Sequence, residues 1–398
     1  MPKLVIELKQ HTPLIHFQGN QHGATLRATE LKPKLDKFLK KHVFKSFKEY
    51  KRYLIGDIEK IEEKEDGESN KAFDYKLKII AKGHEQIIDL EEPYPEIFYI
   101  RKMNENTKKG KKNKKRKNIK KQAVMYDEII LEFFSFHKDL LTKIEENISR
   151  FFAVTNFGLR QNKGFGSFYL KDKKDIIADV KSVYDKFLYI KYDGKTYSDL
   201  MRYVYILYKM MKSGIKFKCK INHKSIYKKY NSFLFEYMKG KGIDNEKRMI
   251  KEEFFNESVR IKKDNQKKYY VRGLLGICNS FYFKDKERRG EINVYNKNIK
   301  RFKSPITFKI VDDYLIIIPE EIPDEIYGAE FEFKYKNESE KIEIPSKEQF
   351  NIFKFLFAFA DWFNDLKIEE DNEKKSNTLR MLKGAKSKPI VKVGEQSG

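Results

Sequence analysis

The sequence predicts an α+β protein, and three observations on its 398 residues support this. Short segments that alternate polar and apolar residues, as strands do, are separated by segments with apolar residues at helical spacing. The chain is long enough for two or more domains, and its 40% hydrophobic residues can fill their cores. In the first half, the order strand, helix, hairpin, helix, strand is that of a ferredoxin-like (RRM-like) sandwich.

The elements of the first half follow from changes of period along the chain. Residues 4–8 alternate and predict a strand, and residues 12–31 predict a loop. Pro33 suits the first turn of a helix, and apolar residues then recur at helical spacing as far as Leu54. The remaining elements expected are a hairpin of strands 73–79 and 86–90 with its turn at 82–84, and a helix at 127–148.

The second half begins with a helical region and then regains strand character. Residues 199–237 are expected to be mainly helical, with repeated Tyr and Met in the core rather than on a base-stacking surface. The apolar helix expected at 350–363 carries the only tryptophan, Trp362. After Leu366 the residues become charged and then small and polar, which predicts a flexible tail. The strands expected between these helices are 269–278, 281–283, 304–310, 314–318 and 329–335.

The charge of the chain is strongly positive. Its 84 Lys and Arg against 59 Asp and Glu give a formal net charge of +25, which favours a polyanionic partner, nucleic acid before membrane. An AT-rich genome would also enrich Lys, but it raises Glu as well and does not by itself produce the excess. Ten basic residues and no acid lie in 108–121, and without them the net charge is +15. We expect this segment to be a disordered loop, either an arm for polyanions or a solvated insertion without specific contacts.

Several other classes of protein are disfavoured. Cys219 and Cys278 have no paired spacing, so neither a disulfide nor a cysteine-ligated metal is expected. The chain contains no H-E-x-x-H, paired D-x-D or Walker sequence, so no metal, cofactor or nucleotide hydrolysis is predicted. There is no apolar signal core at the start and no run of roughly 18 apolar residues. We therefore expect a soluble, cytoplasmic protein that does not contact a membrane.

Residues 156–167, N-F-G-L-R-Q-N-K-G-F-G-S, are the most informative segment. Glycines permit positive φ and close backbone approach, and successive N–H groups of such a loop can form a nest for an anion. An arginine and a lysine add positive charge for phosphate. An ordinary glycine-containing turn is the alternative. The residues predicted to bind a nucleic-acid phosphate here are Gly158, Arg160, Lys163, Gly164, Phe165, Gly166 and Ser167.

Three segments together resemble the RAMP superfamily, the RNA-binding proteins of CRISPR systems. Residues 158–167 are similar to its glycine-rich loop, which ends in a similar G-F-G-S. Residues 26–32, L-R-A-T-E-L-K, resemble the I-R-x-x-x-I-K-G start of the first RAMP subunit of the Cmr (type III-B) effector complex, and 301–306 resemble its late R-x-x-S-P segment. Pro33 stands where that family usually has glycine, and Asp36 where it has a basic residue.

The resemblance implies two ferredoxin-like RNA-recognition folds and a non-catalytic role in antiviral defence. The partners would be the guide RNA near its 3′ end, the matching target RNA and other subunits of a CRISPR ribonucleoprotein. Arg27 and Lys32 lie at a predicted helix start, where anions are favoured, and are either RNA contacts or part of a solvated first turn.

The predicted domain layout follows from these segments. Residues 1–175 form the first ferredoxin-like domain, with the glycine-rich loop and the basic insertion 108–121. Residues 176–365 form a helical region and a second ferredoxin-like domain. Residues 366–398 form the flexible tail.

Two other functions remain open from the sequence. Metal-independent RNA cleavage needs a general acid or base, most often histidine. His11, His16 and His22 lie in the first loop and could serve in a CRISPR RNA-processing endoribonuclease, or they could be polar loop or core histidines. A general nucleic-acid-binding protein would need only the positive charge.

Overall fold

The computed structural model describes residues 2–16, 25–57, 59, 71–89, 122–221, 224–255, 267–284, 289–368 and 376–394. The basic segment 108–121 lies outside these residues. The chain forms two compact units. Unit 1 consists of Met1–Asp185, Asp193–Arg202 and Phe308–Leu315, and unit 2 of Lys186–Tyr192, Tyr203–Thr307 and Ile316–Gly398.

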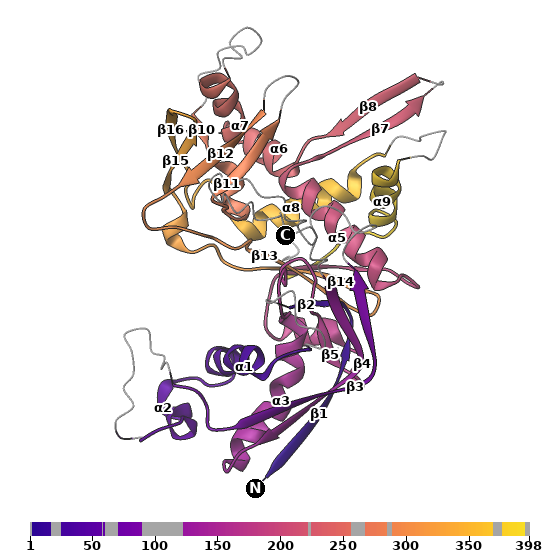
Figure 1. Cartoon of the computed structure of the whole chain (residues 1–398), viewed down its shortest axis with the longest axis vertical. Coiled ribbons are helices and arrows are strands. Elements are labelled where there is room, and N and C mark those ends of the chain that lie inside the picture. The colour runs from indigo at the N-terminus through magenta and orange to yellow at the C-terminus, as the bar shows by residue number, and fades with distance from the viewer. Residues whose placement is uncertain are drawn as a thin grey trace, which may run out of the picture. The chain divides into compact units, whose positions relative to one another are not determined.

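Unit 1 contains a ferredoxin-like sheet (Figure 1). Its strands lie in the order β3-β4-β1-β5, every pair is antiparallel, and β2 also pairs with β4. The sheet has the strand order expected of a ferredoxin-like fold, but the pair of β3 and β4 stands in place of the predicted hairpin at 73–90. The elements are β1 (Lys3–Gln10), β2 (Leu14–Ile15), α1 (Ala28–His42), α2 (Phe47–Tyr50), the 3₁₀ helix η1 (Lys51–Tyr53), β3 (Lys76–Asp89), β4 (Gln122–Phe134), α3 (Lys138–Val154), β5 (Phe168–Leu170) and α4 (Ile176–Lys181).

Three predicted boundaries in unit 1 are wrong. The expected hairpin at 73–90 is one long strand, β3, and the expected turn at Lys82 to His84 is a bulge in it. Gly83 has φ +81° there, and the His84 N–H donates to Asp127 Oδ2 at 2.7 Å. The partner strand β4 occupies the start of the predicted helix 127–148. Helix α1 begins at Ala28, so Pro33 lies inside it rather than in its first turn.

A second sheet has the order β13-β14-β6-β17, with α5 and α8 as its connecting helices. This repeats the strand order of the first sheet, so the predicted class, α+β with two ferredoxin-like domains, is confirmed. The elements are β6 (Phe187–Lys191), α5 (Tyr197–Lys212), β13 (Ile306–Val311), β14 (Tyr314–Pro319), α8 (Ile352–Asp365), α9 (Asn377–Ala385) and β17 (Val391–Val393). The boundary of the two units passes through α5 and β13.

The flexible tail expected at 366–398 is wrong for two segments. Helix α9 begins after Ser376, whose side chain accepts a hydrogen bond from the Leu379 N–H. Strand β17 pairs with β6, with Val391 opposite Tyr189. A strand of only three residues, V-K-V, gives too little periodicity to be recognised in the sequence.

Unit 2 also carries elements inserted between those of its ferredoxin-like sheet. The mainly helical structure predicted for 199–237 is wrong at 215–230, where β7 and β8 form a hairpin. Half of the strand predicted at 269–278 is a 3₁₀ helix. Strands β11, β12, β15 and β16 form a separate antiparallel sheet in that order. The inserted elements are β7 (Ile215–Ile221), β8 (Lys224–Tyr230), α6 (Phe233–Lys239), β9 (Asp244–Asn245), α7 (Glu246–Met249), the π-helical η4 (Ile250–Phe254), β10 (Lys268–Tyr269), the 3₁₀ helix η5 (Val271–Leu275), β11 (Ser280–Lys284), β12 (Arg289–Tyr295), the 3₁₀ helix η6 (Asp324–Ile326), β15 (Glu330–Tyr335) and β16 (Glu338–Glu343).

Aromatic residues fill the core of each unit. Phe151, Phe152 and Phe157 lie in mutual ring contact beneath the sheet of unit 1, with centroids 5.1–6.0 Å apart. In unit 2, Phe233 packs on Phe355 of α8 at 5.4 Å. Among the described residues, no helix has the length and apolar character needed to cross a membrane.

Candidate nucleic-acid interface

The glycine-rich loop, residues 156–167, connects α3 to β5 in unit 1 (Figure 1). A β-bridge between Asn156 and Ser167 closes it at its base. Its three glycines all have positive φ, +76° at Gly158, +85° at Gly164 and +63° at Gly166. The predicted conformational need for glycine is therefore real at each position.

The glycines allow the loop to pack closely on its own unit. A Cβ atom at Gly158 would lie 2.6 Å from Ile15 O, and one at Gly166 only 2.0 Å from Phe157 O. Their N–H groups are also used internally. Gly158 N donates to Glu30 Oε1 at 2.8 Å and Gly166 N to Pro13 O at 2.9 Å. In this conformation both N–H groups are bonded within the protein, so they do not form the predicted anion-binding nest.

Two predicted site residues form the inner side of the loop. Phe165 and Ser167 are both fully buried. The Ser167 hydroxyl donates to Ile310 O at 2.6 Å, and its N–H donates to Thr12 Oγ1 at 2.9 Å. Thr12 Oγ1 in turn donates to Gly164 O at 2.6 Å. These contacts fix the shape of the loop. Phe165 and Ser167 are therefore structural residues of the loop and, in this conformation, do not contact a ligand directly.

The two basic residues of the loop differ in accessibility. Arg160 is half-buried, which lowers the pKa of its guanidinium, and its backbone has φ 58°. The ammonium nitrogen of Lys163 is buried, 6.0 Å from the centroid of the Phe308 ring. A phosphate could therefore meet Arg160 with less rearrangement than Lys163.

The start of α1 places Arg27 and Lys32 differently. Arg27 is the N-cap residue, with an extended backbone and a carbonyl that accepts the Leu31 N–H at 2.9 Å. Lys32 Nζ donates to Phe73 O at 2.7 Å and lies 3.4 Å from the centroid of the Tyr75 ring. Lys32 is thus used inside unit 1, and burial lowers its pKa.

Asp36 explains a departure from the family pattern. Its carboxylate lies 3.6 Å from Lys32 Nζ, and it accepts hydrogen bonds from the Tyr75 hydroxyl at 2.8 Å and from the Phe73 N–H at 3.2 Å. An acid at this position satisfies three donors of the core.

Two lysines that the sequence did not reveal hold the loop in place. Lys34 Nζ donates to Glu30 Oε1 at 2.9 Å, to Asn156 O at 2.9 Å and to Gln161 Oε1 at 2.6 Å, which connects α1 to the loop. Lys309 is fully buried and donates to Thr155 O and Phe168 O, both at 2.9 Å. Burial lowers the pKa of Lys309 well below its usual value. The sequence does contain one indication of the buried role of Lys309, because this lysine interrupts the otherwise apolar strand I-T-F-K-I-V.

The histidines of the first loop are not arranged as an exposed catalytic group. His11 is buried, its Nδ1 accepts the Asp312 N–H at 3.1 Å, and burial lowers its pKa. The imidazole of His11, whose Nδ1 lies 3.4 Å from Asp312 Oδ1, and the Lys9 ammonium at 2.7 Å strongly lower the pKa of the Asp312 carboxyl. His16 is also buried, and His22 lies outside the described residues. Among the residues that the structure describes, no cluster of three or more His, Cys, Asp or Glu could hold a metal.

A basic hairpin in unit 2 was also missed. Residues 215–230 contain six lysines and no acid. Lys216 pairs with Lys229 across the β7–β8 hairpin, and Lys216 Nζ lies 4.8 Å from the centroid of Tyr227, a ring that is 67% exposed. The alternation of lysines at 216, 218 and 220 signals one face of a strand, but the helical reading of 199–237 obscured it.

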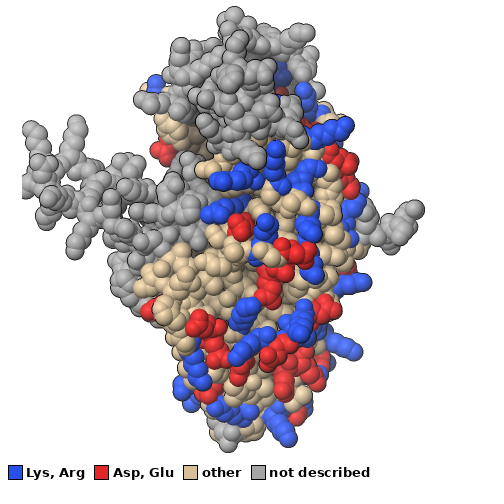
Figure 2. Space-filling model, turned by 90° about the vertical axis from the view of Figure 1, so that its right-hand side faces the viewer, with Lys and Arg blue, Asp and Glu red and all other residues tan. Residues whose placement is uncertain are grey.

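Charge is not segregated into one large patch on the face drawn in Figure 2. Lys and Arg side chains are spread over most of the described surface there, with Asp and Glu side chains among them. On this face, positive charge alone therefore does not mark a binding surface.

Comparisons with known proteins identify the family of the chain. The family model of the Cmr1 N-terminal domain matches residues 1–215, and that of the Cmr1 C-terminal domain matches residues 227–384. No curated protein sequence matches the chain. Among solved structures, the crystal structure of Cmr1 from Pyrococcus furiosus (apo form) is similar, with 11% identity, a TM-score of 0.41 and 98% of each chain covered. Because the family models span both halves of the chain, it belongs to the Cmr1 family, the first RAMP subunits of the Cmr (type III-B) CRISPR effector complex.

Proposed function

We propose that this chain is a non-catalytic RNA-binding subunit of its type III-B effector, which contacts guide RNA and target RNA near the 3′ end of the guide. Membership of the Cmr1 family makes it a subunit of that complex. The RNA contact is supported by the basic composition of the chain and, most directly, by the conformation of Arg160.

Arg160 occupies a backbone conformation that disfavours side chains. Its φ of 58° lies in the left-handed region, where a residue with a Cβ costs about 1–2 kcal/mol. A glycine would avoid this cost, as it does at three other positions of the same loop. The guanidinium itself must therefore account for an arginine here. Its planar set of donors suits a phosphate, which it can bind through two hydrogen bonds.

The surroundings of Arg160 are organised before any ligand binds. Lys34 and Lys309 fix the loop to α1 and to the strand β13. The Glu30 carboxylate in the first turn of α1 holds the Gly158 N–H, which brings the positive N-terminal end of that helix to the loop. Arg27, as the N-cap residue, adds a second cation near this end. A phosphate bound here would thus meet a fixed site.

The salt dependence of RNA binding tests this proposal. Arg160→Ala should weaken binding of a labelled guide RNA and reduce the slope of log K against log salt by about 0.7, the value for one phosphate contact on a single strand. Lys174→Ala is the matched control, because Lys174 is an exposed lysine of unit 1 outside the loop. Equal slopes and affinities for the two folded variants would contradict the proposal. Lys163→Ala should have the smaller effect of the two loop variants.

The non-catalytic role has a separate test. The buried ring of His11, with Nδ1 already bonded, argues against a general acid or base that meets RNA directly. The isolated chain should leave labelled repeat RNA and target RNA intact in EDTA. Cleavage that disappears when His11, His16 and His22 are all replaced by Ala would instead support the endoribonuclease. Guide-dependent co-purification with other Cmr subunits separates the proposal from general nucleic-acid binding.

A further inference from the structure

Unit 2 contains a pocket of about 620 Å³ that none of the predicted site residues lines. It lies where the base of the β7–β8 hairpin meets α6, the segment 244–248 and β11. Its volume is within the range of roughly 300–1,000 Å³ that is usual for small-ligand sites. The pocket is therefore large enough for one nucleotide of a strand.

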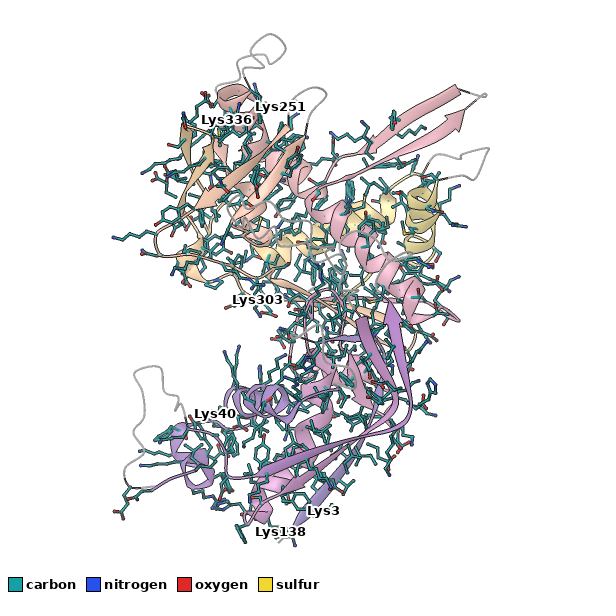
Figure 3. All side chains as sticks on the ribbon, viewed as in Figure 1. Lys3, Lys40, Lys138, Lys251, Lys303 and Lys336 are labelled. Atoms are coloured by element: carbon teal, nitrogen blue, oxygen red, sulfur yellow. The ribbon has the colours of Figure 1, made fainter. Side chains whose placement is uncertain are left out.

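The lining of this pocket is basic. It contains seven Lys or Arg and only two acids, Asp244 and Glu246. Both acids are already paired with lining arginines, Asp244 with Arg248 at 3.0 Å and the buried Glu246 with Arg272. The five remaining cations of the lining are lysines, of which Lys251 is labelled in Figure 3. The lining therefore favours an anion.

The lysines at the mouth of the pocket are accessible. Lys229 at the end of β8 and Lys239 at the end of α6 are both exposed. Within the described part of the chain, neither of these two side chains forms an ion pair. Lys212, deeper in the pocket, donates to Leu275 O at 3.0 Å and to Gly276 O at 2.9 Å, so it belongs to the framework.

Aromatic rings form another part of the lining. Tyr282 on β11 lines the pocket and is 49% exposed. Its neighbour Phe281 is covered by the Arg272 guanidinium, 4.7 Å from the ring centroid. An accessible ring in one pocket with two exposed lysines, Lys229 and Lys239, is the combination by which proteins bind single-stranded nucleic acid, with bases stacked on rings and phosphates on cations.

We propose that this pocket binds one nucleotide of single-stranded RNA, with its base on Tyr282 and its phosphates on Lys229 and Lys239. The proposal rests on the RNA-binding function inferred above and adds a second contact point, in unit 2. An acidic peptide would satisfy the lysines but leaves the exposed ring of Tyr282 without a role.

The test uses the full chain and a labelled decauridylate that contains 4-thiouridine. Tyr282→Ala should raise Kd about tenfold, because one base stacked on an aromatic ring contributes on the order of 5- to 150-fold. Tyr295→Ala is the matched control, since Tyr295 is 57% exposed on the neighbouring strand β12 but does not line the pocket. It should change Kd less than about twofold. Photocrosslinks should map to β11.

The lysines are tested by salt dependence. Replacing Lys229 and Lys239 together by Ala should reduce the slope of log K against log salt by about 1.4, two single-strand phosphate contacts. Lys354→Ala, an exposed lysine of unit 2 outside the pocket, should leave the slope unchanged. Unchanged melting temperatures will show that each variant is folded.

The outcomes separate this inference from the proposed function. If Arg160→Ala weakens binding but the pocket variants behave like Tyr295→Ala, the pocket proposal is wrong and the RNA-binding function stands. If the folded wild-type chain binds no RNA, both are wrong. If UMP binds the wild type and not Tyr282→Ala, while decauridylate binds both equally, the pocket takes a free nucleotide and the RNA strand is excluded.

Discussion

Replacement of Gly166 by alanine should be among the most damaging single changes in the glycine-rich loop. The new Cβ would lie 2.0 Å from Phe157 O and 2.8 Å from Phe157 C. Neither group can easily move away, because Phe157 N donates to Gly166 O and Gly166 N donates to Pro13 O, both at 2.9 Å. Relief of the clash must therefore break at least one backbone hydrogen bond of the buried loop.

The cost can be worked out from two contributions. A Cβ at φ +63° costs about 1–2 kcal/mol, and loss of one buried backbone hydrogen bond costs about 1–3 kcal/mol. Gly166→Ala should thus destabilise unit 1 by about 2–5 kcal/mol. Gly194 offers a matched control, because its φ is +67° but no atom lies within 4 Å of its Cβ position. Gly194→Ala should cost about 1 kcal/mol, since a less flexible unfolded chain offsets part of the strain.

Urea unfolding of the full chain, followed by circular dichroism, compares the two variants in one transition because both positions belong to unit 1. The midpoint should fall much further for Gly166→Ala than for Gly194→Ala. Equal midpoints would show that the loop moves away from Phe157 without cost, and the packing role assigned to Gly166 would be refuted.

Two further changes test buried charges. Because the folded pKa of Lys309 is lowered, the unfolded chain binds more protons between that pKa and about 10.5, so Lys309 makes stability rise with pH over this window. Lys309→Met should remove that rise. The prediction would be contradicted if the urea midpoints of wild type and variant changed in parallel from pH 7 to 10. Glu246→Gln removes a buried carboxylate that pairs with the partly exposed Arg272 and should lower the free energy of unfolding by about 3 kcal/mol. Asp324→Asn, which removes an exposed pair, should lower it by less than about 1 kcal/mol, and similar thermal unfolding of these two variants would refute the burial argument.

The sequence predicted those elements whose own periodicity is strong. Helix α8 was expected at 350–363 and is observed at Ile352–Asp365, because its apolar residues recur at helical spacing and Asn351 caps its N-terminus. Strand β4 was mistaken for helix because Ile129, Ile130 and Leu131 are consecutive apolar residues, all buried. Such a run does not distinguish a strand of a sheet interior from a helix.

The glycines in the sequence marked where the backbone is irregular, but not which structure forms there or which residues it contacts. Gly83 marks a break in regularity, and both a hairpin turn and a β-bulge use such a residue. At Gly158 and Gly166 the need for glycine was predicted, but the atoms that enforce it belong to Pro13, Ile15 and Phe157. Phe157 lies in the same loop, but Pro13 and Ile15 are more than 140 positions away, and contacts this distant in sequence leave no trace in the local pattern. The role of Lys34 was hidden for the same reason, since Asn156 and Gln161 are 122 and 127 positions from it.

The pairing of β17 with β6 has a consequence for how this protein is made. The two strands are about 200 residues apart in the chain, and a ribosome needs roughly 10–40 s to add that many residues. During this time the edge of β6 that β17 later covers has no partner strand of its own chain. Open strand edges recruit other chains, so nascent copies of this subunit carry a temporary aggregation risk. A truncation before Val391 would make that open edge permanent.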